Sequence, residues 1–292
     1  MALHTSGTVE TGDGVSLAYD QWGDPSKPNI VLLSGWNQTA AQWRKQYSAL
    51  SDHFHITTYD HRGHGESEKT DHGFRVSRLA ADLDELLVQL NLRSVTLVGH
   101  SLGCAVIWCW CDLYPNRRST INSLVFIDQV AVMLPRPHWT EVETKHYGCV
   151  FPNDEVPDAF FQALAGPDSR AVTSGFVASM FTSNASPDDV NFALEQNAIM
   201  DSKHAAALLH DHTRHDWRDV LPTINVPALV VGGAGSVQTP IAGCKWVAAR
   251  IPGARFVEFS EEEGGSHCLF VENPTKFNAI LKQFLETQAV SV

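Results

Sequence analysis

A serine flanked by glycines, in the run Gly99-His100-Ser101-Leu102-Gly103, is the feature of this sequence best suited to covalent chemistry. Residues 94–98 are short, apolar and β-branched, as in a buried strand, and 102–114 can form a helix. A serine in so sharp a turn takes a strained backbone conformation, and the flanking glycines leave room for neighbouring chain. We therefore expect Ser101 to be a nucleophile at the carboxyl edge of a sheet. The backbone N–H of Leu102, at the start of the helix, would bind an oxyanion.

A serine hydroxyl becomes a useful nucleophile when a base removes its proton, and histidine is the usual base. Among the fourteen histidines, His267 is the best placed. It ends the run Gly264-Gly265-Ser266-His267, which lies between a predicted last strand at 255–259 and a predicted last helix at 275–286. This position is at the same edge of the sheet as Ser101, and the glycines allow the loop to turn its imidazole inward.

A third group, an acid that orients the imidazole, is absent from its usual place after the strand at 228–233, where residues 234–238 contain no carboxylate. Asp128 ends the preceding apolar strand, and a charge there is unfavourable unless it is paired. We therefore predict Asp128 as the partner of His267. The alternative is that Asp128 only caps a turn. The acidic run at 261–263 is close to His267 in sequence, but like charges in a row are typical of a solvated loop.

Four side chains are candidates for contact with a substrate. Trp36 follows the predicted strand at 29–34, so its backbone N–H could be the second oxyanion donor and its indole could line a pocket. His100 adjoins the nucleophile. Trp139 and Phe181 are chosen from the aromatic residues of the segment after Asp128, which could line a pocket for the substrate. For each of them, ordinary packing is the alternative explanation.

Strands alternate with helices along most of the chain. The predicted strands are 15–22, 29–34, 55–59, 94–98, 121–128, 228–233 and 255–259, and the predicted helices are 41–50, 76–90, 102–114 and 275–286. This order favours right-handed crossovers and a mostly parallel central sheet flanked by helices. The segment 129–216 shows no convincing strand, and we expect it to be a helical cap inserted into a core made of 1–128 and 217–292.

Composition narrows the possible partners. The net charge of -12 argues against nucleic acid and anionic membranes, and 43% hydrophobic residues allow a sizeable core. The six cysteines form no CxxC pair, so buried free thiols in a reducing compartment are expected. No leader and no apolar run long enough for a membrane span is recognisable, which favours a cytoplasmic location. No nucleotide or metal motif is present, so we expect no cofactor and no metal.

Four motifs together resemble the α/β-hydrolase fold superfamily over nearly the whole chain. They are Gly35-Trp36 after a strand, Asp60-His61-Arg62-Gly63-His64-Gly65, the run around Ser101, and Gly265-Ser266-His267 followed by Glu272-Asn273-Pro274. The resemblance implies an α/β fold and serine-hydrolase chemistry. The missing acid after 228–233 departs from the usual pattern. Some members of the superfamily carry the acid one strand earlier, where Asp128 stands, and these include lactone-opening enzymes, dehalogenases and cofactor-free ring-cleaving dioxygenases.

The expected function is hydrolysis of a carboxylic ester or lactone through an acyl-enzyme, with Ser101, His267 and Asp128 as a triad. The substrate would be a small hydrophobic or aromatic molecule, and the sequence does not indicate an oligomeric state. Two further enzyme classes remain open, a cofactor-free dioxygenase and a lyase, each of which would use only the His267–Asp128 dyad. A third alternative is a non-catalytic receptor of the same fold that binds a small molecule.

Overall fold

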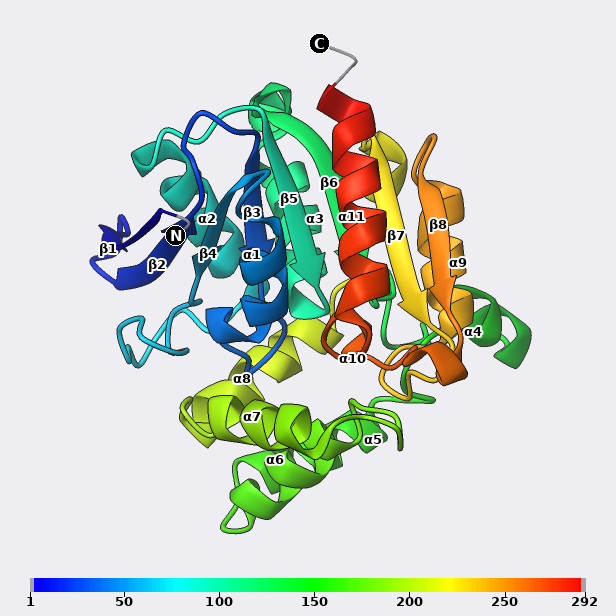
Figure 1. Cartoon of the computed structure of the whole chain (residues 1–292). Helices are drawn as coiled ribbons and strands as arrows, with labels where there is room; N and C mark the ends of the chain where they lie inside the picture. The colour runs from blue at the N-terminus through cyan, green and yellow to red at the C-terminus, as the bar shows by residue number, and fades with distance from the viewer. Residues whose placement is uncertain (1–2, 290–292) are drawn as a thin grey trace.

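A single twisted sheet forms the centre of the computed structural model, which describes residues 3–289 (Figure 1). Its strands are β1 (His4–Glu10), β2 (Ser16–Trp22), β3 (Asn29–Leu33), β4 (His55–Tyr59), β5 (Val95–His100), β6 (Ile121–Ile127), β7 (Ala228–Gly233) and β8 (Arg255–Phe259). They lie in the order β1-β2-β4-β3-β5-β6-β7-β8. From β4 to β8 all neighbours are parallel, whereas β1 pairs with β2, and β2 with β4, in antiparallel fashion. The predicted fold class is confirmed.

The central strands are buried on both faces, which explains their continuous apolar sequences. In β3, Val31 and Leu33 join the core on one side of the sheet, and Ile30 and Leu32 join the core on the other. This alternation follows from the two-residue period of a strand. The parallel strands end at a common edge, so the residues that follow β3, β5, β6 and β7 are brought together there.

Helices cover both faces of this sheet. They are α1 (Arg44–Leu50), α2 (Val76–Gln89), α3 (Leu102–Leu113), α9 (Ile241–Arg250), α10 (Leu269–Glu272) and α11 (Pro274–Ala289). Figure 1 shows α1 and α11 on the near face and α2, α3 and α9 on the far face. Residues 102–111 of α3 are all buried, which suits a helix that is apolar on every side.

The chain between β6 and β7 forms helices and crosses to the carboxyl edge of the sheet. It contains α4 (Glu141–Tyr147), α5 (Glu155–Leu164), α6 (Ser169–Ala178), α7 (Pro187–Asn197) and α8 (Ser202–Thr213). In Figure 1, α5, α6 and α7 lie beyond the arrowheads of the strands, whereas α4 lies apart from them, beside α9. The two ends of this segment are joined, because Val132 pairs with Asp216 and the Trp217 N–H donates to the Ala131 carbonyl at 2.9 Å.

The loop after β4, which carries the motif at residues 60–65, is held by buried charge. The Arg62 guanidinium is fully buried and donates to Asp82 of α2 at 2.7 and 2.8 Å and to Asp13 at 2.9 Å. Asp60 accepts from the Ala40 backbone N–H at 2.7 Å. These bonds connect the β1–β2 turn, the loop after β4 and α2, and so keep the sheet edge in place.

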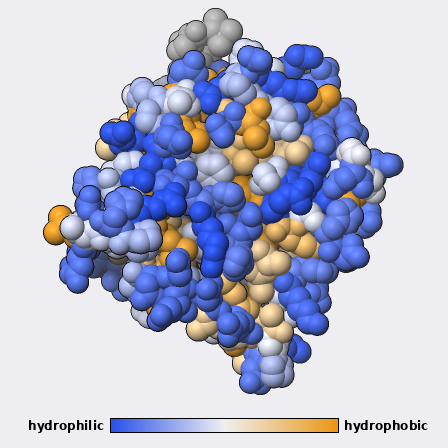
Figure 2. Space-filling model, turned by 180° about the vertical axis from the view of Figure 1, so that it is seen from behind, coloured by the Kyte–Doolittle hydropathy of each residue, from blue (hydrophilic) through white to orange (hydrophobic). Residues whose placement is uncertain are grey.

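Three of the strands and α-helices of the core were not predicted from the sequence: β1, α9 and the single turn α10. β1 is an exposed edge strand, and α9 fills the crossover between β7 and β8. Figure 2 shows the face opposite to that of Figure 1, on which hydrophilic residues predominate and apolar residues form small groups. Within residues 3–289 no helix combines the length and the apolar character needed to cross a membrane. The six cysteines are free, and all except the half-buried Cys149 are buried.

Candidate active site

Ser101 occupies the sharp turn between β5 and α3. Its backbone is strained, with φ 51° and ψ −118°, and its N–H donates to the Ile127 carbonyl at 3.0 Å. A Cβ at Gly99 would lie 2.6 Å from the Gly103 carbonyl carbon, and a Cβ at Gly103 would lie 2.6 Å from the Leu33 carbonyl oxygen. Neither position has room for a Cβ, so both must be glycine where neighbouring backbone segments approach closely. The turn places Ser101 at the carboxyl edge of the sheet, in a cavity that residues of segment 129–216 also line.

His267 and Asp128 are in direct contact. Asp128 follows β6 in a left-handed conformation, with φ 51°, and its carboxylate is fully buried. Its Oδ2 accepts from His267 Nδ1 at 2.6 Å. Since a carboxylate only accepts, Nδ1 carries the proton of this bond, and Nε2 is the ring nitrogen that Asp128 does not engage.

Ser236, which sequence reasoning missed, completes the environment of this carboxylate. Its hydroxyl donates to Asp128 Oδ2 at 2.6 Å, and the Gly233 N–H donates to Oδ1 at 3.0 Å. Ser236 lies after β7, in the place where an acid was first sought. A hydroxyl at that place was the available signal, because it can stabilise a carboxylate supplied by the neighbouring strand.

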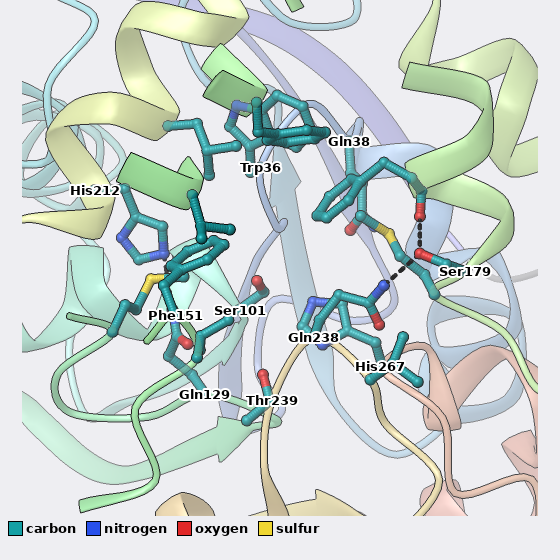
Figure 3. A pocket seen from close by; sticks show the side chains of 18 residues that line it. Trp36, Gln38, Ser101, Gln129, Phe151, Ser179, His212, Gln238, Thr239 and His267 are labelled. Carbon is teal, nitrogen blue, oxygen red and sulfur yellow. Dashed lines mark hydrogen bonds between the residues drawn. The ribbon is translucent and has the colours of Figure 1, made fainter. Parts of the chain in front are cut away.

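Ser101 and His267 line the same cavity, of about 340 Å³ (Figure 3). Ser101 Oγ has no hydrogen-bond partner within residues 3–289, so the structure shows no bond between it and His267. Catalytic hydrogen bonds are often long before substrate binds. The structure thus brings His267 and Asp128, the expected base and acid, into contact and places Ser101 in the same cavity.

The two expected oxyanion donors are also at this edge. The backbone N–H groups of Trp36, after β3, and Leu102, at the start of α3, have no acceptor among the residues that the structure describes. The Trp36 indole lines the cavity, and its Nε1 donates to the Ala205 carbonyl of α8 at 2.7 Å. The side chain is therefore fixed by the cap segment while its backbone N–H stays unpaired.

Core and cap segments both contribute to the cavity wall. Its apolar side chains include Met133, Phe151, Phe160, Phe176, Met180 and Leu209. Its polar side chains include Gln38, Gln129, Ser179, His212, Gln238 and Thr239. Figure 3 shows Gln129 and His212 on one side and Ser179 with Gln238 on the other.

Trp139 and Phe181 do not line this cavity, contrary to expectation. Trp139 precedes α4, which packs beside α9, and its ring lies 4.6 Å from that of Tyr147 and under the Arg218 guanidinium. Phe181 packs instead in a small gap with Phe192, and the preceding residue, Met180, faces the cavity. The sequence could not show which of two adjacent turn residues would face inward.

His100 is likewise not part of the cavity wall, so the structure agrees with the packing explanation and not with contact to a substrate. Its ring is fully buried behind Ser101, with Nε2 2.9 Å from the His267 carbonyl oxygen and Nδ1 3.1 Å from the Gln38 amide. Burial, together with the neighbouring His267, holds the pKa of His100 well below its ordinary value. His100 therefore supports the loop of His267 as a neutral ring.

Comparison with known proteins agrees with this geometry. A family model described as the alpha/beta hydrolase fold matches residues 28–274. The chain belongs to the α/β-hydrolase fold family. Its match to the family model covers the strands and loops that carry Ser101, Asp128 and His267.

Several family members are similar over nearly their whole length. A non-heme chloroperoxidase of Kitasatospora aureofaciens is 27% identical, over 94% of this chain and 98% of that protein. The 3-oxoadipate enol-lactonase 2 of Acinetobacter baylyi is 24% identical, over 94% of this chain and 96% of that protein. A solved esterase of Exiguobacterium antarcticum superposes with a TM-score of 0.85 at 22% identity, covering 96% and 98% of the two chains. Family membership therefore leaves several chemistries open.

Proposed function

We propose that this protein is a serine hydrolase that cleaves a carboxylic ester or lactone of a small hydrophobic or aromatic molecule. The contact of 2.6 Å between His267 Nδ1 and Asp128 Oδ2, beside Ser101 in a common cavity, is the observation that carries the proposal. The similarity to an enol-lactonase and an esterase supports it.

Each residue has a definite part in the proposed reaction. His267 Nε2 removes the proton from Ser101 Oγ, which attacks the carbonyl carbon, and the N–H groups of Trp36 and Leu102 stabilise the oxyanion. His267 then protonates the leaving oxygen, and the acyl group stays on Ser101. Water, deprotonated by His267, releases the acid, while Asp128 stabilises the imidazolium at each stage.

The helical segment 129–216 is proposed as the cap that closes this site. Met133, Phe160 and Phe176 belong to it and line the cavity next to Ser101. An apolar wall excludes water, which strengthens the interaction of an oxyanion with its donors. A reducing cytoplasmic location is also proposed, since buried free thiols suit that compartment.

A second candidate is a cofactor-free dioxygenase or lyase that uses only the His267–Asp128 dyad. The dyad is already in contact, whereas Ser101 Oγ is not yet bonded to His267, so proton abstraction from a bound substrate would need no further rearrangement of the dyad. In that reaction Ser101 would only donate or accept a hydrogen bond.

Labelling with a fluorophosphonate separates the two candidates. We expect mass spectrometry to find the adduct on Ser101, and Ser101→Ala to lower ester turnover by ~10⁴ or more, as removal of a triad serine does. Turnover that persists within tenfold in the variant, or oxygen consumption with a 3-hydroxy-4-quinolone in place of ester cleavage, would favour the dyad enzyme. Stoichiometric ligand binding with no turnover would indicate a receptor.

A further inference from the structure

The cavity beside Ser101 contains no aspartate, glutamate, lysine or arginine among its described lining residues. Its ionisable side chains are His212 and the proposed base, His267. A charged group on a substrate would lose its water there without gaining a counter-ion, and such a transfer is unfavourable by several kcal/mol. The cavity wall thus favours an uncharged molecule.

Gln129 is the residue directly after Asp128, and its side-chain amide is held in one orientation. Gln129 Oε1 accepts from the Val130 backbone N–H at 3.0 Å, so Nε2 faces His212 Nε2, 2.8 Å away. An amide nitrogen only donates, so the ring nitrogen must accept. His212 is therefore neutral, with its proton on Nδ1, and burial lowers the pKa of His212 to about 3.

The Gln129 amide has one hydrogen that this arrangement does not use. Its nitrogen carries two, and His212 Nε2 is its sole acceptor within the described part of the chain. Elsewhere in the wall, Gln238 Nε2 donates to Ser179 Oγ at 2.7 Å and the Thr239 hydroxyl donates to the Asp128 carbonyl at 3.1 Å, whereas Gln238 Oε1, which can only accept, has no partner among the described residues. Gln129 is 3% exposed, so this hydrogen has little access to bulk water.

We propose that Gln129, oriented by neutral His212, is a specificity-determining residue that donates a hydrogen bond to an uncharged oxygen of the substrate. This oxygen lies outside the scissile bond, as in a keto or ether group of the acyl part. The proposal rests on the proposed ester or lactone hydrolysis and adds the substrate class: apolar, uncharged, with one acceptor oxygen away from the reacting carbonyl.

An anionic group would not fit equally well. To supply a cation, His212 would have to be protonated at Nε2, which would set two donors against each other. Relief would require the Gln129 amide to turn over, and that would break its bond to the Val130 N–H. The pair therefore discriminates between a neutral and a charged acceptor.

The test compares p-nitrophenyl heptanoate with its 4-oxo, 5-oxo and 6-oxo derivatives, which place a keto oxygen at successive positions. We expect kcat/KM for one derivative to exceed that for heptanoate by ~10-fold in the natural protein, as for one added neutral hydrogen bond. In Gln129→Met this ratio should fall to about one. The matched control, Gln238→Met, changes another glutamine of the same wall and should keep the ratio.

Charge is tested with the p-nitrophenyl ester of pimelic acid monomethyl ester and the corresponding free acid. The neutral ester should be cleaved at least ~10-fold faster at pH 7.5. Equal rates for this pair, no keto derivative preferred, or a preference that survives Gln129→Met would overturn the inference. The rate ratio within each variant is the readout, so a general loss of activity cancels.

If the proposed hydrolase function is wrong, the role of Gln129 can still be tested by ligand binding. If no ester is cleaved, calorimetry with Ser101→Ala compares binding of the methyl esters of heptanoate and the three oxoheptanoates. Tighter binding of one keto ester that is lost in Ser101→Ala/Gln129→Met supports the role of Gln129 without any turnover. Equal binding of all four esters contradicts that role.

Discussion

Asp128 directly follows β6 and Ser236 lies three residues after the neighbouring strand β7, and the structure joins them through one carboxylate oxygen. Asp128 Oδ2 accepts from both Ser236 Oγ and His267 Nδ1, each at 2.6 Å. The Ser236 hydroxyl is therefore bonded to the same carboxylate oxygen that contacts the imidazole. An exchange of their positions becomes a direct test of the proposed role.

Replacement of Asp128 by asparagine should lower ester turnover by ~10⁴, because an amide can present a donor to Nδ1 and stabilise the wrong tautomer. The double variant Asp128→Ser/Ser236→Asp should recover at least ~10-fold relative to Asp128→Asn, since the new carboxylate would approach His267 from the next strand. Turnover is measured with a p-nitrophenyl ester.

Glu262→Gln is the control for this pair, because Glu262 lies near His267 in sequence but is exposed. It should retain natural turnover. If the turnover of Asp128→Asn stays within tenfold of that of the natural protein, the assignment of Asp128 as the acid is contradicted.

Among the elements, the helices of segment 129–216 supply much of the apolar wall of the cavity. Phe176 of α6 packs edge-on against Trp36, with ring centroids 5.5 Å apart, and against Phe160 at 5.1 Å. Trp139, although also aromatic and in the same segment, packs with Tyr147 next to α9. These two positions therefore offer a matched pair of substitutions.

Phe176→Ala should widen the cavity and raise the kcat/KM of octanoate relative to acetate esters by ~10-fold, because methylene groups gain room in an apolar pocket. Trp139→Ala should leave this ratio within about twofold of the natural value, because Trp139 does not line the cavity. The measurement is kcat/KM across p-nitrophenyl acetate, butanoate, hexanoate and octanoate. An unchanged profile in Phe176→Ala, or an equal change in Trp139→Ala, would show that α6 does not set acyl preference.

Sequence patterns predicted the elements whose burial is periodic or continuous. The strands after which Ser101 and Asp128 stand are mainly apolar and buried almost throughout, and helix α2 repeats leucine at helical intervals. β1 was missed because its residues are mostly exposed and carry no apolar pattern. α9 was missed because its glycine and short length weaken the helical signal.

The cavity wall could be predicted only in part. Trp36 follows a core strand, so its place could be predicted from the sequence order. Gln129 and His212 are 83 residues apart, and their contact depends on how α8 docks on the core. The prediction that Trp139 and Phe181 line the pocket failed for the same reason, because aromatic content predicts packing but not the direction in which a side chain points.

Over the whole molecule, buried neutral histidines make stability depend on pH. Burial lowers the pKa of His61 and of His212 to about 3 and of His64 to about 4, from an ordinary value of 6.5. The unfolded chain binds protons at these positions below pH 6.5, whereas the folded chain does not. Their contribution to stability is therefore complete above pH 6.5 and is lost as the pH falls toward 4 and then 3.

Each such histidine should lower the free energy of unfolding by about 1.4 kcal/mol per pH unit below pH 6. Urea unfolding at pH 6.0, 5.5 and 5.0 measures this slope. His64→Asn lacks one of these histidines, so its slope should be smaller by about 1.4 kcal/mol per pH unit. The raised pKa values of Asp60 and Asp82 act in the opposite direction in both proteins, so they cancel in the comparison.

His146→Asn is the control, since His146 is exposed on α4, and its slope should equal that of the natural protein. If His64→Asn does not fold, His212→Asn tests the same effect at another fully buried ring. If His64→Asn or His212→Asn has the same slope as His146→Asn, the buried histidines do not cause the pH dependence of stability.

The pairing of Val132 with Asp216 means that the chain leaves the core and returns to it at one point. The insertion is thus attached as a branch, and its length and internal design are not constrained by the spacing of the strands that flank it. A different helical branch grafted between residues 132 and 216 would leave Ser101, Asp128 and His267 on an unaltered sheet. Evolution and engineering alike can therefore exchange the part of the cavity wall that this segment supplies while keeping the three residues of the proposed triad.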